Sequence, residues 1–218
     1  MPFENKRAEL AIKLNHVLLT QGITSPTMGS LAHSIGISRA SLYTYFRNKD
    51  AIVEAVVARH LHFASLNPIP TSFVAEQFPK VLLDSLLFAG STTERFLTEL
   101  RLAYPTPAND LAQAQTQRRD QWREYLLRAQ RAKYLVDDTI ASVDFMMFHM
   151  EHAMSAILEA ATHKDIDLLH AEEYLQNLVN TLLRGFVAAP EPALKLLAEQ
   201  GPYEQRILQE FRDTYGRV

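Results

Sequence analysis

The apolar residues of this chain recur at helical spacing along almost its whole length, and this pattern restricts the fold more than any other feature. The first segment shows it clearly, with Leu10, Leu14, Val17 and Leu18 on one face of a predicted helix. No segment has the strict alternation of a half-buried strand, and only 7 of the 218 residues are glycine. We therefore predict an all-α fold, in a chain long enough to form one large or two small domains.

Glycines and prolines mark where the predicted helices end. The predicted helices span residues 4–21, 28–34, 39–46, 49–65, 73–89, 92–104, 108–135, 139–161, 168–187, 193–200 and 203–215. Pro79 lies inside the fifth helix and predicts a kink there. Pro105 and Pro107 are predicted to separate the sixth helix from the seventh, and Asp137 or Asp138 to cap the eighth.

The stretch from Thr27 to Asp50 has the local signals of two short helices joined by a tight turn. Thr27 and Ser38 can each accept hydrogen bonds from the free N–H groups at a helix start. Gly36 can take the left-handed conformation that ends the first of the two helices. The residues that can cluster inward are Leu31, Ala32, Ile35, Ile37 and Leu42. This arrangement predicts a helix-turn-helix, whose second helix can lie in the major groove of DNA.

Many residue types at fixed offsets in the first quarter of the chain resemble the N-terminal signature of TetR-type (tetracycline-repressor-like) transcriptional regulators. The residues that carry this resemblance are Gly22, Thr27, Leu31, Ala32, Gly36, Ile37, Ser38, Leu42, Tyr43, Tyr45, Phe46, Asn48, Lys49 and Asp50. Ala40 and Ile35 depart from it, because glycine and alanine are usual at those positions. The resemblance implies a three-helix DNA-binding domain, residues 1–50, followed by a helical ligand-binding and dimerisation domain, residues 51–218.

Seven polar residues are candidate contacts to double-stranded DNA. Arg39 and Ser41, together with Thr44, are predicted to read base edges, because the arginine fork fits the acceptors of guanine. The residues whose positions in the family motif imply phosphate contacts are Thr27, Ser38, Tyr43 and Lys49. The helix predicted over residues 49–65 begins beside this element, so it is a candidate for transmitting movement from the body.

The charge distribution fits contact with phosphates at one end of the molecule. Residues 1–50 carry a net charge of +3, the whole chain −3, and the remainder therefore −6. The chain has no cysteine, which excludes disulfides, thiolate metal sites and cysteine nucleophiles. No run of eighteen apolar residues and no signal-peptide pattern is present, so we expect a soluble cytoplasmic protein with no membrane partner.

The second half of the chain holds the candidate ligand-binding and dimerisation residues. The candidate ligand-binding residues are Trp122, Tyr125, Phe145, Met146, Phe148, His149 and His152. Helices 139–161 and 168–187 have more apolar surface than one subunit readily covers, which predicts a four-helix bundle between two chains. The arginine-rich part of helix 108–135 (Arg118, Arg119, Arg123, Arg128 and Arg131) is interpreted as a solvated face that pairs with Asp120 and Glu124.

Two classes of function follow from these patterns. The first is a homodimeric repressor that a small, largely apolar ligand releases from a palindromic operator. The alternative is an all-helical metal-dependent enzyme, because His149 and His152 lie three residues apart with Glu151 between them. The chain contains no phosphate-binding glycine loop, nucleophile elbow or zinc-protease motif, so we predict no catalytic residue, no metal and no cofactor. A third possibility keeps the DNA-binding head and makes the body a docking surface for a protein partner.

Overall fold

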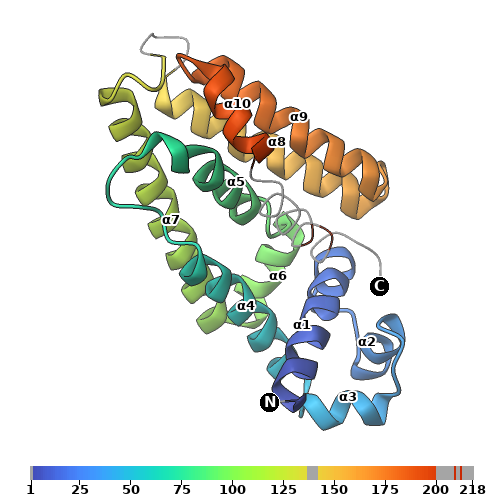
Figure 1. The fold of residues 1–218 in the computed structure, drawn as a ribbon. Coiled ribbons are helices and arrows are strands. Elements are labelled where there is room, and N and C mark those ends of the chain that lie inside the picture. Colours follow the sequence, from blue (N-terminus) through green and yellow to red (C-terminus); the bar gives the residue numbers. More distant parts are fainter. Residues whose placement is uncertain (1, 137–141, 200–208, 210–211, 213–218) are drawn as a thin grey trace.

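The computed structural model describes residues 2–136, 142–199, 209 and 212, and this part of the chain is built from helices. The elements are α1 (Pro2–Gln21), α2 (Met28–Ser34), α3 (Arg39–Tyr45), α4 (Lys49–Leu66), the 3₁₀ helix η1 (Ala75–Gln77), α5 (Phe78–Ala89), α6 (Glu94–Ala103), α7 (Pro105–Arg131), α8 (Val143–His163), α9 (Leu168–Phe186) and α10 (Pro190–Glu199). Helices α1–α3 form a head at one end, and α8 and α9 run side by side along the far side of the body (Figure 1). The all-α prediction is confirmed.

Pro79 and Pro105 lie where helices begin in this structure, and α6 and α7 are separate helices that meet at Pro105, as predicted. Pro79 lies in the first turn of α5, and Pro105 is the first residue of α7. The first turn of a helix has N–H groups without intrahelical acceptors, so a residue that lacks the N–H costs nothing there. The predicted kink at Pro79 is therefore wrong, and so is the predicted start of α7 at Ala108.

The start of α8 differs from its prediction as well. Ser142 is the N-cap, because its hydroxyl accepts a hydrogen bond from the Phe145 N–H at 3.2 Å. Asp137 and Asp138, the predicted caps, lie outside the described residues, and so does most of the predicted helix 203–215. None of the described helices is long and apolar enough to cross a membrane.

Side-chain caps fix the three short junctions of the head. Thr27 Oγ1 accepts from the Ser30 N–H at 3.2 Å, and Ser30 Oγ accepts from the Thr27 N–H at 2.8 Å. Ser38 caps α3 and Asn48 caps α4 by accepting from backbone N–H groups three residues on. Helices α2, α3 and α4 therefore each start at a position that the local sequence specifies.

The hydrophobic core has two parts, and the part under the head extends into the body. The head cluster joins residues of α1–α4 to Phe96 and Leu100 of α6 and to Ala108 and Leu111 of α7. The body cluster joins α5 and α7–α10 around Phe78. Because packing continues across residue 50, the division into domains 1–50 and 51–218 stays a prediction.

A buried hydrogen bond joins α1 to α4 behind the head. His60 of α4 donates from Nε2 to Asn15 Oδ1 of α1 at 3.0 Å, and both side chains are buried. Burial lowers the pKa of His60 to about 3, and the nearby Arg59 charge adds to this effect. The imidazole is therefore neutral at physiological pH, so α1 and α4 meet without a buried charge.

The two left-handed glycines of the head offer a matched test of how the head is held. Gly22 (φ +81°) and Gly36 (φ +73°) both lie in the left-handed region, so alanine at either site costs about 1–2 kcal/mol. A Cβ at Gly22 would lie 2.6 Å from Glu99 Oε1, whereas nothing lies within 4 Å of one at Gly36. We expect Gly22→Ala to lower the free energy of unfolding by about 1.5–3 kcal/mol more than Gly36→Ala in urea titrations, because it disturbs charged hydrogen bonds of Glu99. Equal losses would contradict this.

Candidate functional site

Helix α3 turns its apolar residues inward and its polar residues outward. Leu42 is fully buried, and the adjacent Phe46 is 1% exposed. The exposed residues here and at the start of α2 include Thr27, Ser38, Arg39, Ser41, Tyr43 and Thr44. Six of the seven predicted DNA contacts are therefore accessible at the end of the molecule far from α8–α10 (Figure 1).

Arg39 is held by a neighbour one turn along α3. Its guanidinium carbon lies 5.5 Å from the centre of the Tyr43 ring, and Nη2 donates to the Tyr43 hydroxyl at 3.4 Å. The Ser38 and Ser41 hydroxyls lie 2.8 Å apart at the start of the same helix. These contacts already order part of the polar face of α3 in the free protein, which reduces the entropy cost when this face binds a partner molecule.

Lys49, the seventh predicted contact, has a second role. Its ammonium donates to the carbonyl oxygens of Thr24 at 3.0 Å and Pro26 at 3.3 Å. Lys49 is half-buried, so it fastens the loop between α1 and α2 to the start of α4. Its phosphate contact stays a prediction.

The geometry defines a class of protein. A capped helix-turn-helix with an exposed polar second helix, mounted on a helical body, is the architecture of a DNA-binding regulator. Residues 16–56 match the family model described as "Bacterial regulatory proteins, tetR family". The segment that contains the helix-turn-helix is therefore similar to the DNA-binding segment of TetR-type regulators.

Two solved structures illustrate what this chain is similar to at low sequence identity. A TetR-family transcriptional regulator from Cytophaga hutchinsonii is 13% identical with a TM-score of 0.50, and the match covers 87% of this chain and 98% of that one. SmeT, the repressor of the Stenotrophomonas maltophilia multidrug efflux pump SmeDEF, is 17% identical with a TM-score of 0.49, over 85% and 94%. No curated protein sequence matches this chain.

The structure separates the predicted ligand-binding residues into two groups. Trp122, Tyr125 and Met146 are buried in the body core. The residues that lie exposed on the outer side of α8 are Phe145, Phe148, His149 and His152. His152 Nδ1 donates to the Phe148 carbonyl oxygen at 2.8 Å. Within the described residues no three His, Asp or Glu side chains come together as metal ligands.

The arginine-rich part of α7 is only partly the solvated face that its sequence indicated, because Arg119, Arg123 and Arg131 are exposed but Arg118 is buried. Arg118 is 6% exposed and donates from Nη1 to the Asn67 carbonyl oxygen at 2.7 Å. Arg119 and Arg123 pair with acidic residues of α8, Glu151 and Asp144, rather than with neighbours in α7. Sequence alone gave no signal for this, because the partners lie on other helices.

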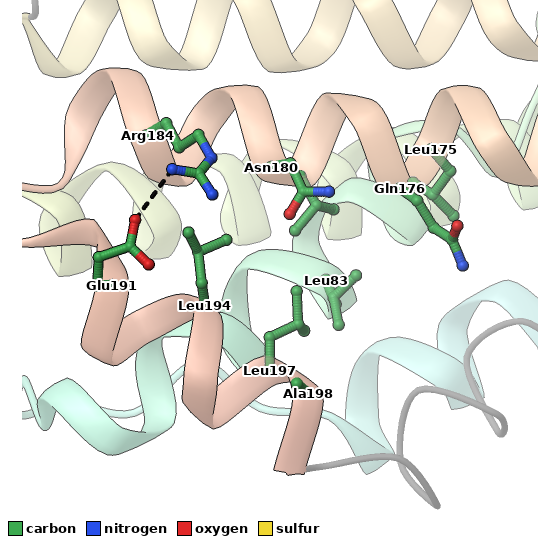
Figure 2. A pocket seen from close by; sticks show the side chains of 10 residues that line it. Leu83, Leu175, Gln176, Asn180, Arg184, Glu191, Leu194, Leu197 and Ala198 are labelled. Carbon is green, nitrogen blue, oxygen red and sulfur yellow. Dashed lines mark hydrogen bonds and ion pairs between the residues drawn. The ribbon is translucent and has the colours of Figure 1, made fainter.

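Two cavities of the body are candidate ligand sites. The smaller, about 190 Å³, lies between α5, α7 and α8 and is lined by Ser85, Phe88, Ala89, Gln115, Arg118, Arg119, Trp122, Met150 and Glu151. The larger, about 370 Å³, lies between α5, α9 and α10 (Figure 2). Its charged groups, Arg184 and Glu191, pair with each other at 3.0 Å (Figure 2). Only the smaller cavity contains a residue predicted to bind ligand, Trp122.

A carboxylate of α6 joins the body to the loop that precedes α2. Glu99 Oε2 accepts from the N–H groups of Ile23 at 2.6 Å and Thr24 at 2.7 Å, and Arg95 pairs with Oε1 at 3.0 Å. Burial raises the pKa of Glu99, but the hydrogen bonds from Thr24, Arg95 and Ile23 outweigh it and lower the pKa to about 2. This contact was not predictable, because 75 residues separate Glu99 from Thr24.

A second link joins the two parts at the start of α4. The Tyr104 hydroxyl donates to Asp50 Oδ1 at 3.0 Å. Burial and this carboxylate raise the pKa of Tyr104 to about 12, so the phenol stays protonated and keeps donating at physiological pH. Glu99 and Tyr104 therefore contact the chain just before and just after the helix-turn-helix.

Proposed function

We propose that this chain is a homodimeric transcriptional repressor that a small ligand, bound in the body, releases from a palindromic operator. The observation that carries the proposal is the exposed polar face of α3, set by the caps Thr27 and Ser38 within the segment that matches the TetR family. Arg39, Ser41 and Thr44 would contact base edges, and Thr27, Ser38, Tyr43 and Lys49 would contact phosphates. Such a protein acts on DNA in the cytoplasm.

The proposed dimer interface is the outer face of α8 and α9. Four of the exposed large apolar residues among the described residues lie on these two helices: Phe145, Phe148, Leu169 and Tyr174. The ring centre of Phe145 lies 6.1 Å from that of the buried Phe186, so this exposed ring of α8 packs against α9. An apolar face of this kind supports pairing with a second copy, and His149 and His152 would then lie in the interface rather than in a ligand pocket.

Ligand release would operate through the geometry of the two heads. A two-fold dimer places its two α3 helices in successive major grooves about 34–36 Å apart. A ligand in the cavity beside Trp122 would favour one spacing of the heads, by no more than its difference in affinity for the two states. The links from α6 to the head, through Glu99 and Tyr104, support this route.

The proposal is tested by selection of duplexes from a random pool with the full-length protein. We expect enrichment of an inverted repeat whose half-sites are about one helical turn apart. A pool that shows no enriched sequence after repeated rounds would overturn the proposal. Enrichment of a single half-site would overturn the dimeric arrangement and leave DNA recognition standing.

Two substitutions separate base readout from phosphate binding. Arg39→Ala is expected to cost about 1–3 kcal/mol of binding free energy and to relax preference at one base step. Lys49→Ala is expected to weaken binding to all sequences alike and to flatten the salt dependence, because a phosphate contact carries no sequence information. Anisotropy titrations with the selected duplex and single-base variants measure both effects. A uniform loss in both variants would contradict these assignments.

A further inference from the structure

We propose that two exposed cations beside the C-terminal end of α3, Arg47 and Lys6, bind phosphates of the operator backbone. This deepens the proposed function, because it rests on DNA binding by α3 and adds two contacts to the seven that the sequence predicts. Three features carry the inference: the packing of α1 against the end of α3, the charges at this end of the molecule, and the length of α3.

Two aromatic contacts hold the start of α1 against the end of α3. The rings of Phe3 and Tyr45 are stacked, with their centres 5.0 Å apart and an angle of 26° between their planes. One turn further along α1, the guanidinium carbon of Arg7 lies 5.2 Å from the centre of the Phe46 ring. The start of α1 therefore lies beside the end of α3, at the same end of the molecule as the helix-turn-helix (Figure 1).

The same packing fixes where Lys6 lies. Residues three and four positions apart share one side of a helix, so Lys6 and Arg7 lie on the same side of α1 as Phe3. Lys6 pairs with Glu9 at 2.8 Å, but the two side chains are 45% and 50% exposed. An exposed pair of this kind is weak, so a phosphate can take the place of the Glu9 carboxylate.

Arg47 follows Phe46 directly and is exposed at the point where α3 ends. Its guanidinium is a planar fork of N–H donors, which can bind two oxygens of one phosphate. Lys49, two residues further on, is half-buried, and its ammonium already donates to the carbonyl oxygens of Thr24 and Pro26. Arg47 is therefore the more accessible of these two cations.

The nearby acidic groups do not cancel these charges. The Asp50 carboxylate accepts a hydrogen bond from the Tyr104 hydroxyl at 3.0 Å, so it is engaged within the protein. Glu4 lines the groove between α1 and α4, together with Ala55 of α4. Residues 1–50 carry a net charge of +3 with all acidic residues counted, so this end of the molecule attracts phosphate.

The length of α3 brings its C-terminal end close to a wall of the major groove. Its 7 residues span about 10 Å at about 1.5 Å per residue, and the groove is about 12 Å wide. When Arg39 and Ser41 at the N-terminal end meet base edges, the other end of so short a helix lies near the phosphates that border the groove. Arg47 and Lys6 are exposed cations at that end.

Salt dependence measures the two contacts. The affinity of the full-length protein for the selected duplex is measured by anisotropy between about 50 and 200 mM salt. We expect Arg47→Gln to reduce the slope of log affinity against log salt concentration by about 0.9, which is about 8-fold weaker binding at about 100 mM if the affinities converge near 1 M. Lys6→Gln is expected to reduce the slope by about half as much, because Lys6 also pairs with Glu9. Preference among single-base variants should not change, since phosphates carry no sequence information.

Arg131→Gln is the matched control. Arg131 is exposed and is the last residue of α7, which ends at the opposite end of the molecule from α3 (Figure 1). We expect this variant to keep the wild-type slope and affinity, although it loses the same charge. An unchanged slope in either Arg47→Gln or Lys6→Gln, or an equal change in the control, would overturn the inference.

Neutral phosphate analogues locate the Arg47 contact on the DNA. Single methylphosphonate groups replace the phosphates of one half-site in turn, and the affinity of each duplex is measured for the wild type and for Arg47→Gln. We expect at least one position where the analogue weakens the wild type by about 5-fold or more and Arg47→Gln by less than about 2-fold, because the variant has no cation left to lose there. If every position weakens the two proteins equally, Arg47 does not contact the backbone.

Phe3 is a positioning residue, and a double-mutant cycle tests this role. We expect Lys6→Gln to weaken binding by about 3-fold in the wild type. In Phe3→Ala, which changes no charge, the same substitution should weaken binding by less than about 1.5-fold, because α1 is no longer held against Tyr45. Phe3→Tyr keeps the stacked ring and should restore the full effect. Equal effects of Lys6→Gln in all three backgrounds would overturn the positioning role.

The outcomes separate this inference from the proposed function. Selection of an inverted repeat, together with wild-type salt slopes in Arg47→Gln and Lys6→Gln, would overturn the two backbone contacts and leave the proposed function standing. A protein that selects no duplex, but whose general affinity for DNA falls in both variants, would support the contacts and overturn the proposed function.

Discussion

Phe148→Asp in α8 is expected to convert the dimer into a monomer and to lower operator affinity by about 100-fold or more, because bivalent contact with two half-sites is lost. Phe148 is 54% exposed and lies on the same outer face as Phe145, so an aspartate there places a charge in the proposed interface. Sedimentation velocity gives the oligomeric state, and anisotropy with the selected duplex gives the affinity.

Leu102→Asp is the matched control for the dimer. Leu102 is 81% exposed on α6, so its replacement introduces the same charge outside α8 and α9. We expect this variant to remain a dimer with wild-type operator affinity. A dimeric Phe148→Asp protein, or an equal loss of affinity in both variants, would show that this face does not join two chains.

Glu99→Gln is expected to lower the free energy of unfolding at pH 7 by about 2 kcal/mol. The pKa of Glu99 falls from 4.5 to about 2 in the folded state, and each pKa unit corresponds to about 1.4 kcal/mol. Partial exposure of the side chain reduces the full value. The same substitution weakens the hold of α6 on Ile23 and Thr24, so we also expect a smaller effect of ligand on operator affinity.

The stability that Glu99 contributes changes with pH, and its lowered pKa fixes the direction of that change. A carboxyl group whose pKa is lowered by folding stabilises the folded state above its unfolded pKa of 4.5, and this stability is lost as the pH falls toward 2. Urea titrations between pH 7 and pH 3 should therefore show a steeper loss in the wild type than in Glu99→Gln. Glu94→Gln, at an exposed residue of the same helix, is expected to change stability by less than about 0.5 kcal/mol. Parallel pH curves for wild type and Glu99→Gln would contradict the role of this carboxylate.

The head was predictable because its signals are local. Thr27, Gly36 and Ser38 act within four residues of themselves, so the caps and the turn follow from the sequence. The starts of α5 and α7 were misjudged for a local reason too, because Pro79 and Pro105 fit the first turn of a helix, where no N–H donor is needed.

The links between head and body and the lining of the cavity could not be predicted in the same way. Glu99 and Arg118 resemble ordinary surface charges in the sequence, and only the packing of α6 and α7 brings them to Thr24 and Asn67. Helix α8 shows the same limit. Its apolar residues occupy two faces, and the sequence did not distinguish Met146 in the core from Phe148 on the exposed side.

The central claim is that the polar face of α3 recognises DNA, and a salt series tests it most directly. The affinity of the full-length protein is measured for the selected duplex and for a scrambled one between 50 and 200 mM salt. The account predicts a linear fall of log affinity with log salt concentration for both duplexes, and tighter binding of the selected duplex at every concentration. Equal binding of the two duplexes, or an affinity that does not change with salt, would contradict it.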